Sequence, residues 1–170
     1  PPTEEDRYFR QQRIQGYVHD MGAAMLGGVS GHAGLFANAN DLAVIMQMLL
    51  QQGFYGGHRY LEPQTVHNFI TRHPRSVRRG VGFDMYPMGA SYPTNMSGQA
   101  SESTFGHTGF TGTCTWVDPE HNLVYVFLSN RTFPSMNNNR LEKMDTRQRI
   151  QGMVYKAIRP KGAGGSSTAQ

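Results

Sequence analysis

Residues 105–113 bring together a titratable ring, a hydroxyl group and several glycines. The two polar residues are His107 and Thr108, and three glycines stand around them: Gly106, Gly109 and Gly112. Such a stretch can hold backbone N–H groups at a fixed edge and form a pocket for an anion or an oxyanion, with the N–H of Phe110 pointing into it. The alternative is a β-turn in which the glycines supply positive φ angles. Residue types alone leave both interpretations open.

An activated nucleophile is harder to find in this chain. The Ser-x-x-Lys arrangement places a lysine base one helical turn after the serine, but none of Lys143, Lys156 and Lys161 has a serine three positions before it. Residues 28–31 approach the Gly-x-Ser-x-Gly elbow without matching its spacing. We therefore interpret Ser30 as a loop hydroxyl.

Other kinds of site are also disfavoured. His19, Asp20 and His32 share a glycine-rich stretch, but their spacing matches no standard metal site, so we expect them to tie down the loop. Cys114 is the single cysteine, which excludes an internal disulfide and a cysteine-based zinc site. We predict no metal and no cofactor.

Composition favours a folded, soluble domain. The 170 residues are 38% hydrophobic and carry a formal net charge of +4, with a mean hydropathy of −0.53. The arginines are scattered, and residues 72–79 are interpreted as a solvated loop rather than a nucleic-acid surface. No apolar run reaches the roughly 20 residues of a membrane helix.

Helices are predicted in three places. Apolar residues recur at helical spacing after Asn38, a good N-cap, and Gly53 ends that helix. Pro63 suits the first position of a second helix, which ends before Pro74. A closing helix is predicted over residues 146–158.

Strands alternate with long loops. Residues 80–86, 113–117 and 123–128 have strand character, and the last two form an antiparallel hairpin across residues 118–122. The last strand is apolar throughout, so we expect both of its faces to be covered. Residues 1–16 are a lead-in arm or a short helix, residues 16–34, 87–104 and 131–144 are loops, and 161–170 is a flexible tail. The fold class is α+β with an antiparallel sheet.

Three stretches carry a resemblance to a known family: residues 31–43, 106–112 and 128–131. They resemble, in order, the Gly-Gly-Leu-Phe loop with its helix start, the Lys/His-Thr-Gly third motif and the next sheet strand of the serine β-lactamase and penicillin-binding-protein-like hydrolases, in the class C and esterase-like branch. More narrowly, residues 16–20 and 130–139 resemble the β-lactamase-like domain that follows a glycoside hydrolase family 3 domain in some bacterial proteins.

The resemblance implies a fold and a site. Residues 1–160 would be the incomplete C-terminal part of the β-lactamase/transpeptidase-like fold, an antiparallel sheet flanked by helices. His107 would be the third-motif cation or hydrogen-bond donor, Thr108 would contact a substrate carboxylate or carbonyl, and the Phe110 N–H would be half of the oxyanion hole. Gly109 and Thr111 would line the substrate. The family's Ser-x-x-Lys and Tyr-x-Asn motifs would lie before residue 1, and the out-of-order Ser-Met-Asn at 135–137 is interpreted as chance.

The implied function is acyl transfer on an ester, amide or peptidoglycan-type substrate by a serine hydrolase, with this chain inactive by itself. Because a histidine is only partly charged at neutral pH, His107 favours esterase or D-amino-acid peptidase chemistry over β-lactamase activity. A non-catalytic module that binds a cell-wall peptide or its carboxylate is the alternative. We expect a periplasmic or cell-surface location. The missing strands would be supplied by an N-terminal half or by another copy in a homo-oligomer.

Overall fold

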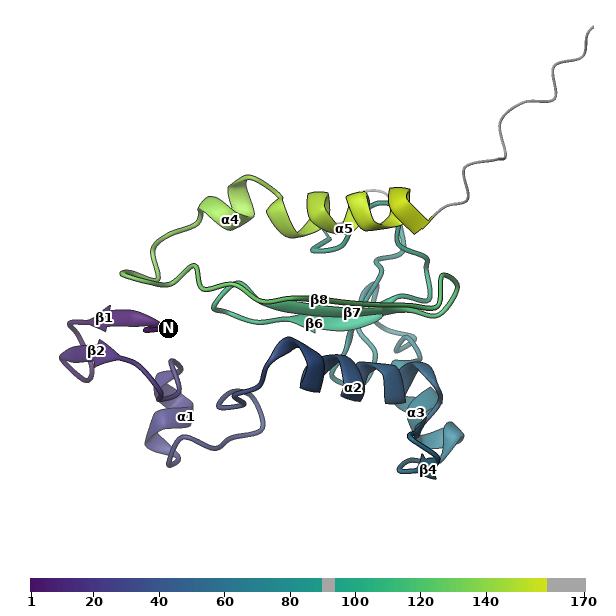
Figure 1. The fold of residues 1–170 in the computed structure, drawn as a ribbon, viewed down its shortest axis with the longest axis horizontal. Coiled ribbons are helices and arrows are strands. Elements are labelled where there is room, and N and C mark those ends of the chain that lie inside the picture. The colour runs from purple at the N-terminus through teal and green to yellow at the C-terminus, as the bar shows by residue number, and fades with distance from the viewer. Residues whose placement is uncertain (90–93, 159–170) are drawn as a thin grey trace, which may run out of the picture.

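A four-stranded antiparallel sheet forms the centre of the molecule. The computed structural model describes residues 1–89 and 94–158; the predicted tail at 161–170 lies outside them. The strands are β5 (Asp84–Met85), β6 (Phe105–Thr108), β7 (Cys114–Asp118) and β8 (Leu123–Phe127), in that order across the sheet. Figure 1 shows α2 (Ala39–Leu50) on one face and α5 (Thr146–Ile158) on the other, so the β8 strand is covered on both faces as predicted.

All three predicted helices are present, and the residues at the starts of α2 and α3 explain where those two begin. The Asn38 side chain accepts the Asp41 N–H at 3.0 Å and caps α2. Pro63 opens α3 (Pro63–Ile70), where its missing N–H costs nothing. After α2 the chain turns at Gly53, whose φ of +86° disfavours any side chain.

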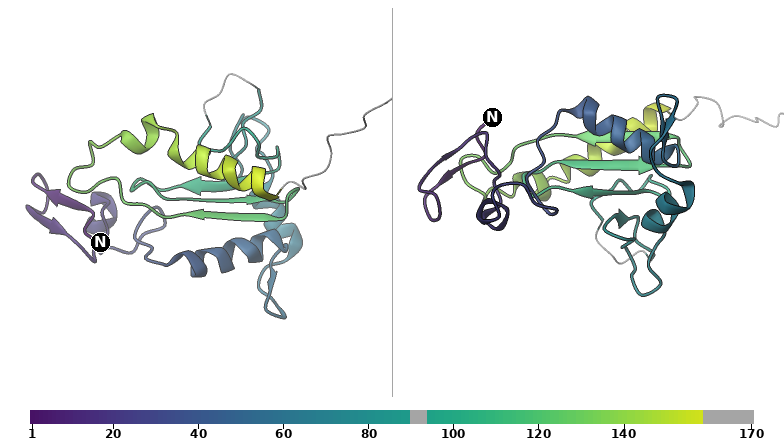
Figure 2. Two further views of the ribbon diagram at one scale, coloured as in Figure 1. Left: turned by 45° about the horizontal axis from the view of Figure 1, so that its top comes forward. Right: turned by 90° about the horizontal axis from the view of Figure 1, so that it is seen from below.

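Alternation along the strands divides the core into two apolar layers. The layer under α2 and α3 contains Met46, Leu49, Val66, Met85, Phe105 and Val117. The layer under α5 contains Met96, Ala100, Cys114, Trp116, Tyr125 and Tyr155. Trp116 and Val117 are neighbours on β7 and face opposite layers, which is the period-2 pattern of a sheet covered on both sides. Figure 2 shows the blue helix α2 and the yellow helix α5 on opposite sides of this sheet.

A buried carboxylate fastens α5 to the sheet. Asp118, at the end of β7, accepts hydrogen bonds from the Tyr155 hydroxyl at 2.6 Å and the Ser101 hydroxyl at 2.7 Å. Burial raises the pKa of Asp118, but these donors outweigh it and hold the pKa at about 2. Burial and the nearby negative charge of Asp118 raise the pKa of the Tyr155 hydroxyl.

The low pKa of Asp118 predicts an acid-labile contribution to stability. An unfolded Asp titrates near 3.9, so the contribution is present above about pH 4 and is lost as the pH falls through about 2. We expect Asp118→Asn to lower the free energy of unfolding by about 2 kcal/mol at pH 7, and the difference from wild type to shrink between pH 4 and pH 2. Urea unfolding across this range measures it. Glu120→Gln, on the exposed turn of the same hairpin, is the control and should show no such convergence.

Several elements depart from the sequence prediction. The arm at 1–16 is a hairpin of β1 (Glu4–Asp6) and β2 (Gln12–Ile14), because the Asp6 carboxylate accepts the backbone N–H groups of Tyr8, Phe9 and Arg10 and folds a turn. Burial raises the pKa of Asp6, yet these bonds lower it to about 2 overall. The elements that were expected to be loop or turn are α1 (Met21–Met25), α4 (Arg140–Lys143), β3 (Phe54–Tyr55) and β4 (His58–Arg59).

Of the strand predicted at 80–86, only β5 (Asp84–Met85) forms. The N–H of Gly80 donates to the Phe83 carbonyl at 3.0 Å, and Gly82 has a φ of +85°, so residues 80–83 form a tight turn. Val81 points into solvent rather than into the core. The apolar alternation was therefore misleading, because the glycines bend the chain before it can pair.

The outer edge of β8 has no neighbouring strand among residues 1–89 and 94–158. Exposed apolar side chains include Leu35, Phe36, Ile45 and Leu128. Within those same residues, no helix is both long and apolar enough to cross a bilayer.

An open edge with exposed apolar groups predicts self-association. We expect light scattering after size-exclusion chromatography to give a mass above that of one chain, rising with concentration. A monomer mass at every concentration would contradict this.

Candidate active site

The third-motif residues lie on β6 where it runs beside β7. Gly106 pairs with Trp116, and His107 pairs with Thr115. A Cβ atom at Gly106 would overlap the Thr115 carbonyl oxygen and the Trp116 ring. The glycine therefore lets the two strands approach closely, and this fixes where His107 and Thr108 emerge.

The turn after β6 orients the Phe110 N–H. Gly109 donates its N–H to the Thr113 carbonyl at 2.8 Å, and the Gly109 carbonyl accepts the Gly112 N–H at 3.0 Å. In a trans peptide the C=O and the N–H point in opposite directions. Because the Gly109 carbonyl points into the turn, the Phe110 N–H points out of it, and it meets no acceptor in the described part of the chain.

The remaining predicted residues lie around the same turn. Thr108 is half-buried opposite Cys114, and its hydroxyl makes no hydrogen bond to residues that the structure describes. The Thr111 carbonyl accepts the Arg131 N–H at 2.8 Å. Gly112 has the expected positive φ of +104°, but Gly109 does not; a side chain there would overlap the Thr113 hydroxyl, so space is the reason for glycine.

His107 is exposed, and both of its ring nitrogens are engaged. Nδ1 lies 2.7 Å from the Thr108 carbonyl oxygen, so Nδ1 must carry the proton and donate it. Nε2 lies 2.8 Å from Nη1 of Arg79, which can only donate, so Nε2 must accept. This network assigns the neutral imidazole with its proton on Nδ1.

Arg79 was missed by sequence reasoning, which placed it in a solvated loop. Its Nη1 lies 3.0 Å from Oδ1 of buried Asp84, and Arg78 Nη1 lies 3.4 Å from the same oxygen. Neither contact has hydrogen-bond alignment, so both attractions are chiefly coulombic. No sequence signal connects Arg79 with His107, because pairing of β5 with β6 brings them together.

Two cationic or aromatic side chains enclose the Phe110 ring. The His19 ring stacks on it at a centroid distance of 5.5 Å, and the Arg131 guanidinium lies 4.7 Å from its centroid. Arg131 Nε also donates to the Phe110 carbonyl at 2.9 Å. Although Phe110 is exposed, its peptide unit is held in place.

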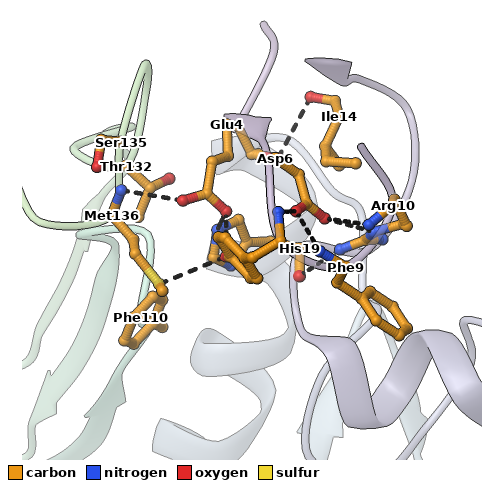
Figure 3. A network of polar contacts seen from close by, with 12 residues as sticks. Glu4, Asp6, Phe9, Arg10, Ile14, His19, Phe110, Thr132, Ser135 and Met136 are labelled. Atoms are coloured by element: carbon orange, nitrogen blue, oxygen red, sulfur yellow. Dashed lines mark hydrogen bonds and ion pairs between the residues drawn. The ribbon is translucent and has the colours of Figure 1, made fainter. Parts of the chain in front are cut away.

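Glu4 connects His19, and through it the Phe110 ring, to the N-terminal hairpin (Figure 3). Its buried carboxylate lies between Met136 and His19, accepting the Met136 N–H at 3.2 Å and the Tyr8 hydroxyl at 2.6 Å, with His19 Nε2 at 3.1 Å. Burial and the Glu4 contact raise the pKa of Tyr8 to about 12. The arm at 1–16 is thus part of the support of the turn, and no pattern in the sequence indicates this.

Substitution of Glu4 tests this support. Glu4→Gln replaces one accepting oxygen with an NH₂ group that faces donors, so we expect a loss of about 1–3 kcal/mol in the free energy of unfolding. Amide hydrogen exchange at residues 108–112 should accelerate. Glu5→Gln is the matched control, because Glu5 pairs with Arg13 at an exposed position and should cost under about 0.5 kcal/mol. Equal effects of the two variants would contradict the assignment.

The glycine-rich stretch forms a separate polar chain. Ser30 Oγ lies 2.9 Å from His32 Nδ1, and His32 Nε2 lies 2.9 Å from Asp20 Oδ1. Asp20 also caps α1 through the Ala23 N–H, and these bonds lower its pKa. The Ser30 N–H donates to the Ala33 carbonyl and so cannot stabilise an oxyanion beside its own hydroxyl. Across the described residues, no three His, Cys, Asp or Glu side chains gather as metal ligands.

Comparison with known proteins assigns the chain to a family. A family model described as Beta-lactamase matches residues 2–148, most of the chain. The chain belongs to the Beta-lactamase family. Within it, the chain is a member of the serine β-lactamase and penicillin-binding-protein-like hydrolases, as the resemblance implied.

Similar curated proteins come from Salmonella. The chain is 40% identical over 131 residues to proteins of Salmonella paratyphi B and Salmonella newport that are provisionally named D-alanyl-D-alanine carboxypeptidase. The match covers 76% of this chain and 30% of each relative. The chain therefore spans about a third of the length of the curated relatives it matches.

A solved structure shows the fold. A β-lactamase from Mycobacterium bovis is similar with a TM-score of 0.56 and 24% identity, over 74% of this chain and 46% of that one. The predicted fold class, an incomplete α+β fold of the β-lactamase type, is confirmed.

Proposed function

We propose that this chain is the C-terminal part of a serine acyl-transfer hydrolase that acts on a D-alanine-terminated peptide. The observation that carries the proposal is the outward-facing Phe110 N–H, in the turn that follows Thr108 at the end of β6. A backbone N–H held rigidly at a reacting carbonyl stabilises the charge that develops on its oxygen.

The turn is suited to serve as one half of an oxyanion hole. The Phe110 N–H would bond the oxyanion together with the N–H of the nucleophile, and the Thr108 hydroxyl would contact the substrate. Removing one such donor typically reduces kcat by about 10²–10³. Pre-organisation by Arg131 and His19 supports this role, because a donor that need not reorient stabilises the transition state more.

The nucleophile is proposed to lie on a segment other than these 170 residues. The sequence contains no Ser-x-x-Lys, and Ser30 lacks an available N–H of its own. We therefore propose that the chain is inactive by itself. A non-catalytic module that binds a cell-wall peptide or carboxylate would share the same turn and the same lack of a nucleophile.

The relatives favour a peptide substrate over a simple ester. Proteins 40% identical to the chain carry the provisional name of a D-alanyl-D-alanine carboxypeptidase, which matches the peptidoglycan-type substrate expected from the motif. Peptides of that kind belong to the bacterial cell wall, so we propose a periplasmic or cell-surface location. An N-terminal half or a second copy of the chain would complete the fold.

Covalent labelling tests the proposed function. The 170-residue chain is incubated with nitrocefin, p-nitrophenyl acetate and a fluorescent penicillin, followed by intact-mass spectrometry. We expect no turnover and no acyl adduct. A longer form of the protein with Ser-x-x-Lys before residue 1 should form one adduct on that serine.

Two outcomes would overturn parts of this proposal. An adduct on the 170-residue chain would show that it holds a nucleophile, and Ser30→Ala would test whether Ser30 is that residue. A natural form without Ser-x-x-Lys that binds D-alanyl-D-alanine peptides without hydrolysis would favour the binding module.

A further inference from the structure

Two buried polar side chains lie in one row across the central sheet. Asp84 pairs with Gly106, and Gly106 pairs with Trp116, so both side chains project from the same face. This is the face under α5, because Trp116 belongs to the apolar layer there, whereas Met85, the neighbour of Asp84, belongs to the opposite layer. The Trp116 ring occupies the space that a side chain at Gly106 would need. Asp84 and Trp116 therefore stand on either side of a position that has no side chain of its own.

Each of these two side chains has a buried polar atom without a hydrogen bond. Trp116 is 1% exposed and Asp84 is 4% exposed. Among the residues that the structure describes, neither the indole Nε1 nor the carboxylate Oδ1 has a hydrogen-bond partner. Leaving a buried donor or acceptor unpaired is costly, and folded proteins commonly satisfy such atoms with an ordered water molecule.

A small cavity lies against both side chains. Its wall includes Asp84 and Trp116, together with the polar residues Thr94 and Asn95. The volume is about 10 Å³, which is close to the smallest space that accommodates a water molecule. The cavity therefore admits one small molecule with polar groups on several sides of it.

The chemistry of the wall selects a neutral ligand that both accepts and donates hydrogen bonds. An indole N–H can only donate, and an ionised carboxylate oxygen can only accept. A cation would face the Trp116 N–H and the guanidinium of Arg78, which also lines the cavity, and an anion would be repelled by Asp84. A water molecule can accept from the indole and donate to the carboxylate, and its second proton remains for an oxygen of Thr94 or Asn95.

We propose that this cavity binds one structural water molecule, which accepts a hydrogen bond from the Trp116 indole N–H and donates one to Asp84 Oδ1. The water joins β5 to β7 across Gly106. It also holds in place the carboxylate that the guanidinium groups of Arg78 and Arg79 contact. Binding of this water is independent of the catalytic role proposed above.

Nuclear magnetic resonance of the ¹⁵N-labelled 170-residue chain tests the proposal. Trp116 is the single tryptophan of the sequence, so its indole N–H gives one unambiguous signal. Magnetisation transfer between this proton and water is measured in the laboratory frame (NOE) and in the rotating frame (ROE). A resident water gives cross-peaks of opposite sign in the two experiments, whereas chemical exchange with solvent gives the same sign. We expect opposite signs at the indole, and no water cross-peak at the backbone N–H of buried Leu49 in α2.

Two variants of Asp84 separate the hydrogen bond from the charge. Asp84→Leu is similar in size but has no acceptor, so the water loses a partner and the indole cross-peak should be lost. Asp84→Asn is the matched control, because it removes the attraction to Arg78 and Arg79 but keeps an accepting oxygen; its cross-peak should persist. If Asp84→Leu does not fold, a high-resolution crystal structure of the wild-type chain supplies the second measurement. One water should then lie within hydrogen-bond distance of both Trp116 Nε1 and Asp84 Oδ1.

Three outcomes would overturn the proposal. The first is a wild-type indole without cross-peaks of opposite sign. The second is a cross-peak that survives Asp84→Leu unchanged, because the carboxylate would then not hold the water. The third is loss of the cross-peak in a folded Asp84→Asn, because the charge and not the accepting oxygen would then maintain the site.

Discussion

The close approach of β6 to β7 at Gly106 is the constraint on which the candidate site depends. No side chain fits there, because the Thr115 carbonyl and the Trp116 ring occupy the space. With the ladder held in this register, Phe105 packs into the layer under α2, and His107 and Thr108 occupy the last two positions of the strand. The turn that follows is closed by the N–H and the carbonyl of Gly109, and this leaves the Phe110 N–H pointing outward.

Buried carboxylates join the peripheral segments to this ladder. Asp118 receives Tyr155 from α5 and Ser101 from the preceding loop, while Glu4 receives Tyr8, His19 and the Met136 N–H. A carboxylate buried with several donors is stable only while all of them are present, since each lost partner leaves a desolvated charge. These acids therefore make distant parts of the chain interdependent, and the rigidity of the turn around Phe110 depends on a hairpin far from it in sequence.

Charge at the third motif is divided between two residues. Lysine at this position would carry its own fixed charge, whereas here the ring of His107 is neutral and the guanidinium of Arg79 stands behind it. A guanidinium stays protonated at all ordinary pH values and binds carboxylates in a planar geometry. The positive charge that the resemblance associates with this position therefore lies on Arg79 rather than on His107.

The sequence by itself determined the elements whose signals are local. Asn38 and Pro63 marked helix starts, and Gly53 marked the turn after α2. Strand-forming residues marked β7, an apolar run marked β8, and the glycines around His107 marked the motif and the family. It failed where a tight turn overrode the apolar pattern: the arm at 1–16 became a hairpin around Asp6, and residues 80–83 turned instead of pairing. Only the tertiary structure brought Arg79 to His107 and Glu4 to His19, because charged contacts between segments far apart in sequence leave no periodic pattern in either segment.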